Sequence, residues 1–124
     1  MIETLNSLPA NVAGFRATGE VTQDDFKNVV FPEVERLVEK QKDLNYLLLL
    51  DTDISNFTAG AWFQDVVLGL KNLTNWNRAA IVTDSEGVIK FTDAFSVLAP
   101  GEYKGYKKSE FEQAVSWVSG GTPA

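Results

Sequence analysis

The stretch from Leu44 to Leu50 constrains the fold more than any other part of the sequence. Every residue in it except Asn45 is apolar, and apolar residues do not alternate with polar ones. A strand covered on both faces shows such an unbroken run, whereas a strand with one wet face alternates. The run ends abruptly at Asp51-Thr52-Asp53. We therefore predict a central strand of a parallel sheet, flanked by a strand on each side.

Two short strands, at 2–8 and 12–18, are expected ahead of this strand. Pro9-Ala10-Asn11 between them is a turn signal, so the pair reads as a hairpin. A helix then opens at Thr22, which forms a capping box with Asp25. Pro32 falls inside this helix and must either kink it or begin its second half. The buried stripe of the helix is predicted to be Phe26, Val30, Val34, Leu37 and Val38.

Strands and helices alternate after the central strand. We expect a helix capped by Thr58, a strand at 76–83, a helix capped by Asp84 or Ser85 that reaches Leu98, an edge strand at 102–106, and a last helix capped by Ser109 with Glu112. The order β-β-α-β-α-β-α-β-α predicts an α/β fold. It has a mixed sheet of about five strands, parallel in its centre, and about four helices. We expect one domain over 1–119 and a flexible tail over 120–124.

Composition narrows the function. The chain has no cysteine and no histidine, which removes disulfides, thiolate chemistry, the commonest general base and the commonest transition-metal ligand. Acidic residues outnumber basic ones 17 to 11, giving a charge of −6, which argues against binding to nucleic acid. The apolar runs are too short for a membrane span, and no signal peptide is visible. These features lead us to expect a cytoplasmic protein without integral membrane association.

Carboxylates follow two neighbouring strands of the predicted sheet. Asp51, Asp53 and Asp84 would meet at the carboxyl edge, where open α/β sheets usually bind ligands. They could hold Mg²⁺, but loop hydrogen bonds and helix capping explain them better. Thr58, Ser85 and Ser109 lie near the starts of predicted helices. We interpret them as helix caps rather than as anion-binding sites. We therefore assign no catalytic residue, no metal ligand and no cofactor.

Aromatic residues crowd the same edge. Phe57 lies in the loop after the central strand, and Trp62 lies off the apolar stripe of the next helix. If these two converge with Phe95 and Leu98, they form an apolar pocket or an exposed patch. Ordinary core packing is the competing interpretation, because large aromatic side chains are usually mostly buried.

Several segments, in order and spacing, resemble the SpoIIAA-like family, a branch of the STAS-type fold. They span nearly the whole chain: Gly14-Phe15-Arg16-Ala17-Thr18-Gly19-Glu20-Val21, Leu48-Leu49-Leu50-Asp51, Ala61-Trp62, Gly69-Leu70-Lys71, Ala80-Ile81-Val82-Thr83-Asp84 and Leu98-Ala99-Pro100-Gly101-Glu102. The resemblance implies a mostly non-enzymatic domain, such as an anti-sigma-factor antagonist, a regulatory domain of an anion transporter, or a sensor. This branch has also been likened to lipid-carrying folds of the SEC14 type.

Antagonists of this type carry Asp-Ser-Ser-Gly in one strand-to-helix turn and are phosphorylated on the second serine. The corresponding stretch here is Phe57-Thr58-Ala59-Gly60, so the phosphoacceptor position is alanine. We expect the phosphorylation switch to be absent, with Thr58 as the one remaining candidate phosphoacceptor.

Two function classes follow from these observations. The first is a regulatory module that binds a protein, with a second copy of the chain as a further candidate partner. The second is a small carrier or sensor of an apolar or amphiphilic, lipid-like ligand. In both cases we expect the binding residues at the carboxyl end of the sheet: Asp51, Phe57, Thr58, Trp62, Asp84, Phe95, Leu98 and Pro100.

Overall fold

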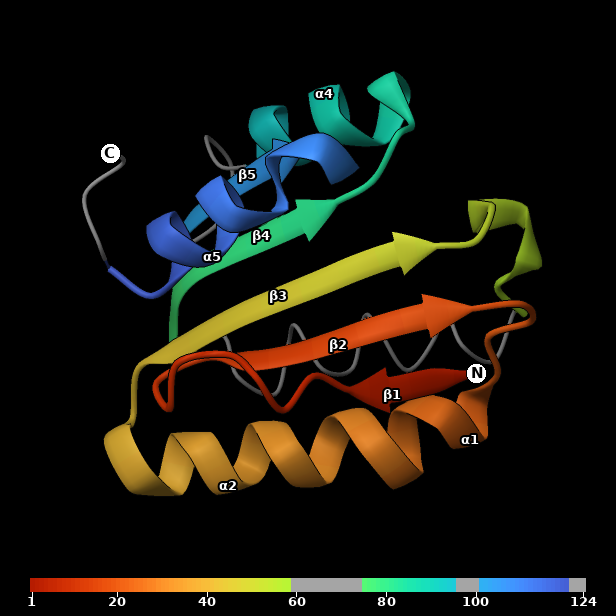
Figure 1. The fold of residues 1–124 in the computed structure, drawn as a ribbon. Coiled ribbons are helices and arrows are strands. Elements are labelled where there is room, and N and C mark those ends of the chain that lie inside the picture. The colour runs from red at the N-terminus through yellow and green to blue at the C-terminus, as the bar shows by residue number, and fades with distance from the viewer. Residues whose placement is uncertain (59–74, 96–100, 121–124) are drawn as a thin grey trace.

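A five-stranded sheet in the order β1-β2-β3-β4-β5 forms the centre of the computed structural model (Figure 1). The structure describes residues 1–58, 75–95 and 101–120. The strands are Ile2–Thr4 (β1), Ala13–Thr18 (β2), Leu44–Asp51 (β3), Trp76–Val82 (β4) and Glu102–Tyr106 (β5). β1 is antiparallel to β2, and every other pairing is parallel. The mixed α/β fold predicted from the sequence is confirmed.

The predicted central strand is β3. It pairs with β2 on one side and β4 on the other, both in parallel. Successive side chains of a strand point to opposite faces, and here both faces are covered. Leu44, Tyr46, Leu48 and Leu50 belong to one hydrophobic core, and Leu47 belongs to a second core on the opposite face. This two-sided burial explains why the strand lacks a polar alternation.

The hairpin is confirmed, but its first strand is shorter than predicted. β1 ends at Thr4, and the chain from Leu5 to Leu8 leaves the ladder after one more hydrogen bond, from the Leu5 N–H to the Gly14 carbonyl (2.9 Å). Leu8 folds over β2 into the space that a side chain at position 14 would occupy. Apolar contact on the face of the sheet therefore replaces strand pairing for these residues.

The first helix begins as predicted, with the capping box of Thr22 and Asp25. It runs as Gln23–Asp25 (α1), a π-helical segment Phe26–Val30 (η1) and Phe31–Gln41 (α2). Pro32 lies in the first turn of α2. Because proline has no N–H, it cannot complete an α-helical bond with the preceding turn, and a π-helical insertion is one way to absorb this loss. The helix thus accommodates Pro32 by a change of helical pitch just before it.

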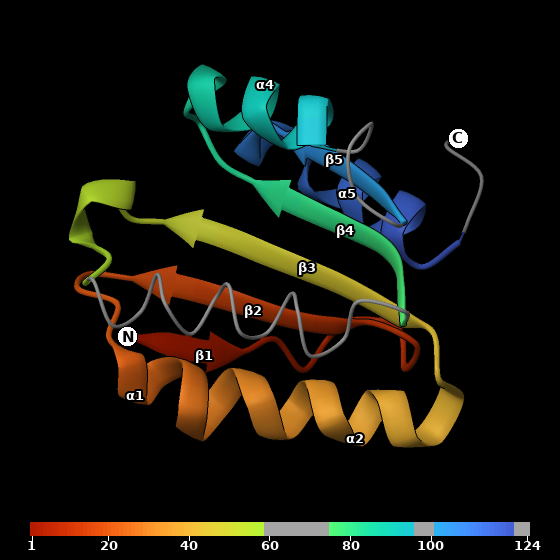
Figure 2. The same cartoon turned by 180° about the vertical axis from the view of Figure 1, so that it is seen from behind.

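The described helices lie on both faces of the sheet. Side chains of η1, α2 and α4 (Glu86–Phe95) pack on the face that carries Leu48, and α5 (Phe111–Val118) packs on the face that carries Leu47. Figures 1 and 2 show α4 and α5 on opposite sides of β4 and β5. No helix in the described ranges is long and apolar enough to cross a membrane.

The starts of the last two helices refine the predictions. Ser85, rather than Asp84, caps α4, because its Oγ accepts the Val88 N–H at 3.4 Å. The expected capping box of Ser109 and Glu112 is wrong. Ser109 lies inside a 3-10 turn, Lys108–Glu110 (η3), that precedes α5. The predicted helix capped by Thr58 and the tail at 121–124 lie outside the described residues, as does the end of the third helix at Leu98.

Candidate functional site

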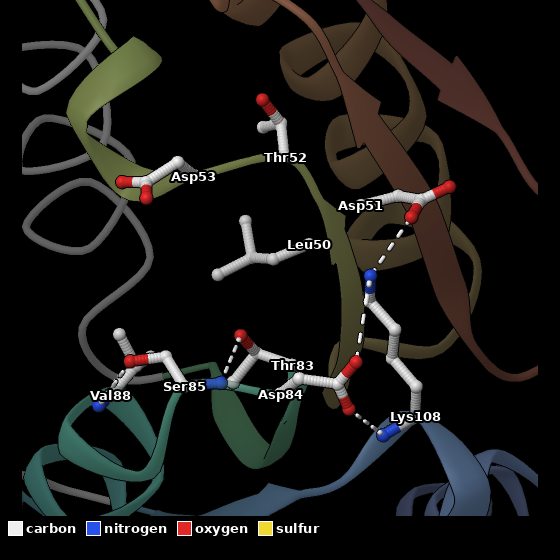
Figure 3. Close-up of a pocket in the computed structure, with 9 residues that line it drawn as sticks. All are labelled: Leu50, Asp51, Thr52, Asp53, Thr83, Asp84, Ser85, Val88 and Lys108. Carbon is white, nitrogen blue, oxygen red and sulfur yellow. Dashed lines mark hydrogen bonds and ion pairs between the residues drawn. The ribbon is translucent and has the colours of Figure 1, made fainter.

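A cleft of about 370 Å³ opens at the carboxyl ends of β3 and β4 (Figure 3). Seven of its nine described lining residues are polar or charged, and the nine come from the ends of β3 and β4, from the start of α4 and from η3. The lining residues are Leu50, Asp51, Thr52, Asp53, Thr83, Asp84, Ser85, Val88 and Lys108.

The strand register explains why three charged residues meet here. Leu49 of β3 pairs with Val82 of β4, and Val82 pairs in turn with Tyr106 of β5. Two residues beyond each of these positions stand Asp51, Asp84 and Lys108. Because the strands are parallel, all three side chains emerge at the same edge of the sheet.

Asp51 accepts hydrogen bonds from two cations. The Arg16 Nε and Nη2 atoms lie 3.1 and 2.5 Å from Asp51 Oδ2, and Lys108 Nζ lies 2.9 Å from Oδ1. Arg16 reaches Asp51 diagonally, because it stands opposite Leu49 on the neighbouring strand and shares its face. The side chain of Asp51 remains 34% exposed, so the ion pairs form at the surface.

These two cations change the acidity of Asp51. The hydrogen bond from Arg16, followed by that from Lys108, lowers the pKa of the Asp51 carboxyl from 3.8 to about 2. A carboxyl with such a low pKa stays ionised throughout the neutral range. It is therefore a fixed negative charge and a poor general acid or base, since those need a pKa near the working pH.

We expect the Asp51 carboxyl to titrate near pH 2 rather than at its ordinary 3.8. Because the folded pKa is the lower one, its ion pairs stabilise the fold above about pH 3.8 and lose that effect as the pH falls toward 2. Carbon NMR of the Asp51 Cγ atom measures the midpoint. Arg16→Gln should raise it, while Arg36→Gln, which breaks the separate ion pair with Glu33 on α2, should not. A wild-type midpoint near 3.8 would contradict the ion-pair geometry.

Local hydrogen bonds hold the other polar residues of the cleft. Asp53 Oδ1 accepts the Ser55 N–H at 2.9 Å, which lowers the pKa of Asp53. Thr83 is buried, and its Oγ1 accepts the Ser85 N–H at 3.2 Å. Asp84 Oδ1 accepts the Lys108 N–H at 3.4 Å. A magnesium site would need several carboxylates close together. In the part of the chain that the structure describes, no group of three or more acidic side chains is placed to hold a metal.

The structure brings together only some of the residues expected at this edge. Asp51 and Asp84 both line the cleft. Phe95 is the last residue of α4, but its side chain is not among the described parts of the structure. Trp62, Leu98 and Pro100 lie outside the described residues.

Phe57 and Thr58 follow β3 in the chain and pair with Val21, which lies beyond the end of β2. Phe57 forms an isolated parallel bridge with Val21, and its ring centroid lies 6.5 Å from that of Phe26. The Thr58 N–H donates to the Val21 carbonyl at 2.9 Å. Phe57 therefore packs on the core beside η1, and neither residue lines the cleft.

Lys108 and Arg16 are the residues that sequence reasoning missed. A signal for Lys108 was present: the Lys107-Lys108 pair follows directly after the predicted edge strand, and so stands at the same edge as Asp51 and Asp84. Arg16 gave a weaker signal, because its partner depends on the register between β2 and β3.

A comparison with protein families matches residues 12–119 to the SpoIIAA-like model. The chain belongs to the SpoIIAA-like family. The match covers β2 through α5 and therefore contains every residue of the cleft. Membership supports the expected kind of function, a regulatory or interaction module, and identifies no ligand or partner.

A solved structure agrees with the assignment of this SpoIIAA-like chain. It is an uncharacterised protein of the DUF3478 family with a SpoIIAA-like fold, from Shewanella loihica PV-4. It is 22% identical, the match covers 94% of this chain and 93% of that one, and the TM-score is 0.69. At this identity the similarity shows the fold alone. A comparison with curated proteins gave no match.

Proposed function

We propose that this chain is a non-enzymatic regulatory module of the cytoplasm, which binds a protein partner at the carboxyl end of its sheet. The observation that carries the proposal is the cleft, where polar and charged side chains from separate elements meet at an accessible edge. Ligands of open α/β sheets bind at this edge. Family membership adds support, since it points to an interaction module.

The chemistry of the cleft favours binding over catalysis. Asp51 and Asp53 both have lowered pKa values, because hydrogen-bond donors stabilise their ionised forms. Neither carboxyl is therefore suited to proton transfer at neutral pH. The Ser85 hydroxyl is exposed and accepts a helix N–H, and the sequence contains no histidine to activate it.

The competing proposal, a carrier of an apolar or amphiphilic ligand, receives less support from the described residues. It relied on Phe57, Trp62, Phe95 and Leu98 forming one apolar pocket. Among the described residues, Phe57 packs toward Phe26, and seven of the nine residues that line the cleft are polar or charged, beside Leu50 and Val88. We retain the carrier as an outcome of the experiment.

The experiment compares two double variants that remove the same amount of charge. Asp53→Asn with Asp84→Asn alters the cleft, and Glu35→Gln with Glu39→Gln alters the exposed face of α2. Each protein is immobilised, proteins captured from a lysate of the host are quantified, and the leading candidate is purified and its affinity measured. We expect the cleft variant to bind about tenfold more weakly or worse, and the α2 variant to bind as wild type.

Two results would overturn the proposal. If the α2 variant loses the partner while the cleft variant keeps it, the binding surface lies elsewhere. If protein purified from its host carries a lipid-like molecule and no protein binds through the cleft, the carrier is the better description.

A Trp62→Ala variant that stays folded is also expected to lose binding, because Trp62 belongs to the edge predicted from the sequence.

A further inference from the structure

We propose that the cleft receives a cationic side chain, lysine or arginine, of the protein partner, and that Lys108 is an internal ammonium group which this side chain displaces. The inference rests on the proposed function and names the chemistry of the partner. The ammonium group of Lys108 already occupies a position beside Asp51 in this cleft (Figure 3).

The seated ammonium lies between two carboxylates. Lys108 Nζ is 2.9 Å from Asp51 Oδ1 and 3.9 Å from Asp84 Oδ2. The first distance is that of a charge-assisted hydrogen bond, and the second is that of a loose ion pair. The geometry of the cleft therefore suits a primary ammonium, and one of its two carboxylates is only loosely engaged by the present occupant.

The lining has more negative charge than Lys108 can balance. Three carboxylates of the described lining, those of Asp51, Asp53 and Asp84, stand against two cations, Lys108 and Arg16, so one negative charge is left over. The side chain of Asp84 is 70% exposed and accessible to an incoming group. Leu50 and Val88 supply apolar lining, against which the methylene stem of a lysine or arginine can pack. The leftover negative charge favours a cationic side chain, and the apolar lining favours one with an aliphatic stem.

Lys108 can release the cleft without disturbing the fold around it. Its side chain is 36% exposed, so its ion pairs are of the weak, solvent-screened kind. Its backbone N–H, which donates to Asp84 Oδ1 at 3.4 Å, holds the start of η3 independently of the ammonium group. When Lys108 leaves, Asp51 keeps its hydrogen bonds from Arg16. The side chain can thus swing out while η3 and β3 stay in place.

The experiment uses synthetic probes, so that it does not depend on finding the partner. Two peptides blocked at both ends, one alternating glycine with lysine and one alternating glycine with glutamate, are titrated into the full chain and followed by NMR. Three variants are compared with wild type: Lys108→Gln, Lys108→Arg, and Lys107→Gln as a control. The control removes the same charge from the adjacent exposed lysine, which does not line the cleft.

We expect the lysine peptide to shift the amide signals of Asp51, Asp53 and Asp84 in wild type, and added salt to weaken the effect. Lys108→Gln should bind it at least about threefold more tightly than Lys107→Gln does, because only the former removes the competing ammonium. Lys108→Arg should bind as wild type, and the glutamate peptide should not shift these signals.

Each alternative result counts against the inference. If the two glutamine variants bind equally, the effect is one of net charge and Lys108 is not displaced. If the glutamate peptide binds in the cleft, or the lysine peptide fails to bind any of the four proteins, the cationic partner is wrong. A protein partner that still depends on the cleft in the capture experiment would then leave the proposed function standing while this inference falls.

Discussion

Alanine at Leu47 or at Leu48 is expected to lower the free energy of unfolding by about 2–5 kcal/mol in each case. The side chain of Leu47 is 0% exposed and lies in the core beneath α5. That of Leu48 is 6% exposed and lies in the core shared with α2, on the other face. Each truncation removes buried methyl groups and leaves a cavity that a close-packed core cannot fully close.

The neighbouring Leu49 is the internal control. It lies on the same strand but is only half-buried, so Leu49→Ala should cost about 1 kcal/mol, clearly less than either neighbour. Urea denaturation measures all three differences, and hydrogen exchange should find the amides of β3 among the slowest in the chain. Losses below about 1 kcal/mol at both Leu47 and Leu48, or rapid exchange along β3, would refute a central strand buried on two faces.

The central strand was predictable because one physical requirement, burial on both faces, leaves a mark at every position. Its single exception, Asn45, is explained only by partners that are distant in sequence. Asn45 Nδ2 donates to the Asn11 carbonyl at 3.0 Å, and Asn45 Oδ1 accepts from Asn77 Nδ2 at 2.8 Å. A buried amide is tolerated there because its hydrogen bonds are satisfied by a loop and by β4.

Helix starts were predicted less well, because several nearby residues can satisfy the same free amides. Thr22 was identified correctly, with its capping box. Ser109 was not, because a 3-10 turn takes up the residues just before α5, and Glu110 accepts the Lys107 N–H at 2.9 Å. The π-helical segment before Pro32 was not predicted either. The spacing of apolar residues indicates which face of the helix is buried, but it does not determine the helical pitch.

The candidate site, too, could be predicted only in part from the sequence. The edge where Asp51 and Asp84 meet follows from the alternation of strands and helices, since parallel strands end together. The partners of Asp51 do not follow from it. Arg16 is 35 residues away and Lys108 is 57 residues away, and each contact depends on the register of a strand pair. Sequence patterns locate such an edge, while pairing decides which charges are neutralised there.

Phe26→Ala is expected to cost about 3–5 kcal/mol of unfolding free energy, the largest loss among the variants considered. The side chain is 0% exposed and anchors η1 in the core between the helix and the sheet. Phe57, whose ring is tilted at 58° to that of Phe26, packs on the same cluster and is only partly buried. Phe57→Ala should therefore cost less, and thermal or urea unfolding measures both.

The double variant decides what Phe57 does. If Phe57 is part of the core, the costs of Phe26→Ala and Phe57→Ala should not add, and the coupling should be about 0.5–1.5 kcal/mol, as for other aromatic pairs. If Phe57 is instead an anchor for a partner, as the sequence alone led us to expect, its substitution should leave stability nearly unchanged and weaken binding in the capture experiment. A coupled loss of stability with intact binding assigns Phe57 to the fold. The binding surface is then confined to the charged cleft and to those residues of the predicted edge that lie beyond the described ranges.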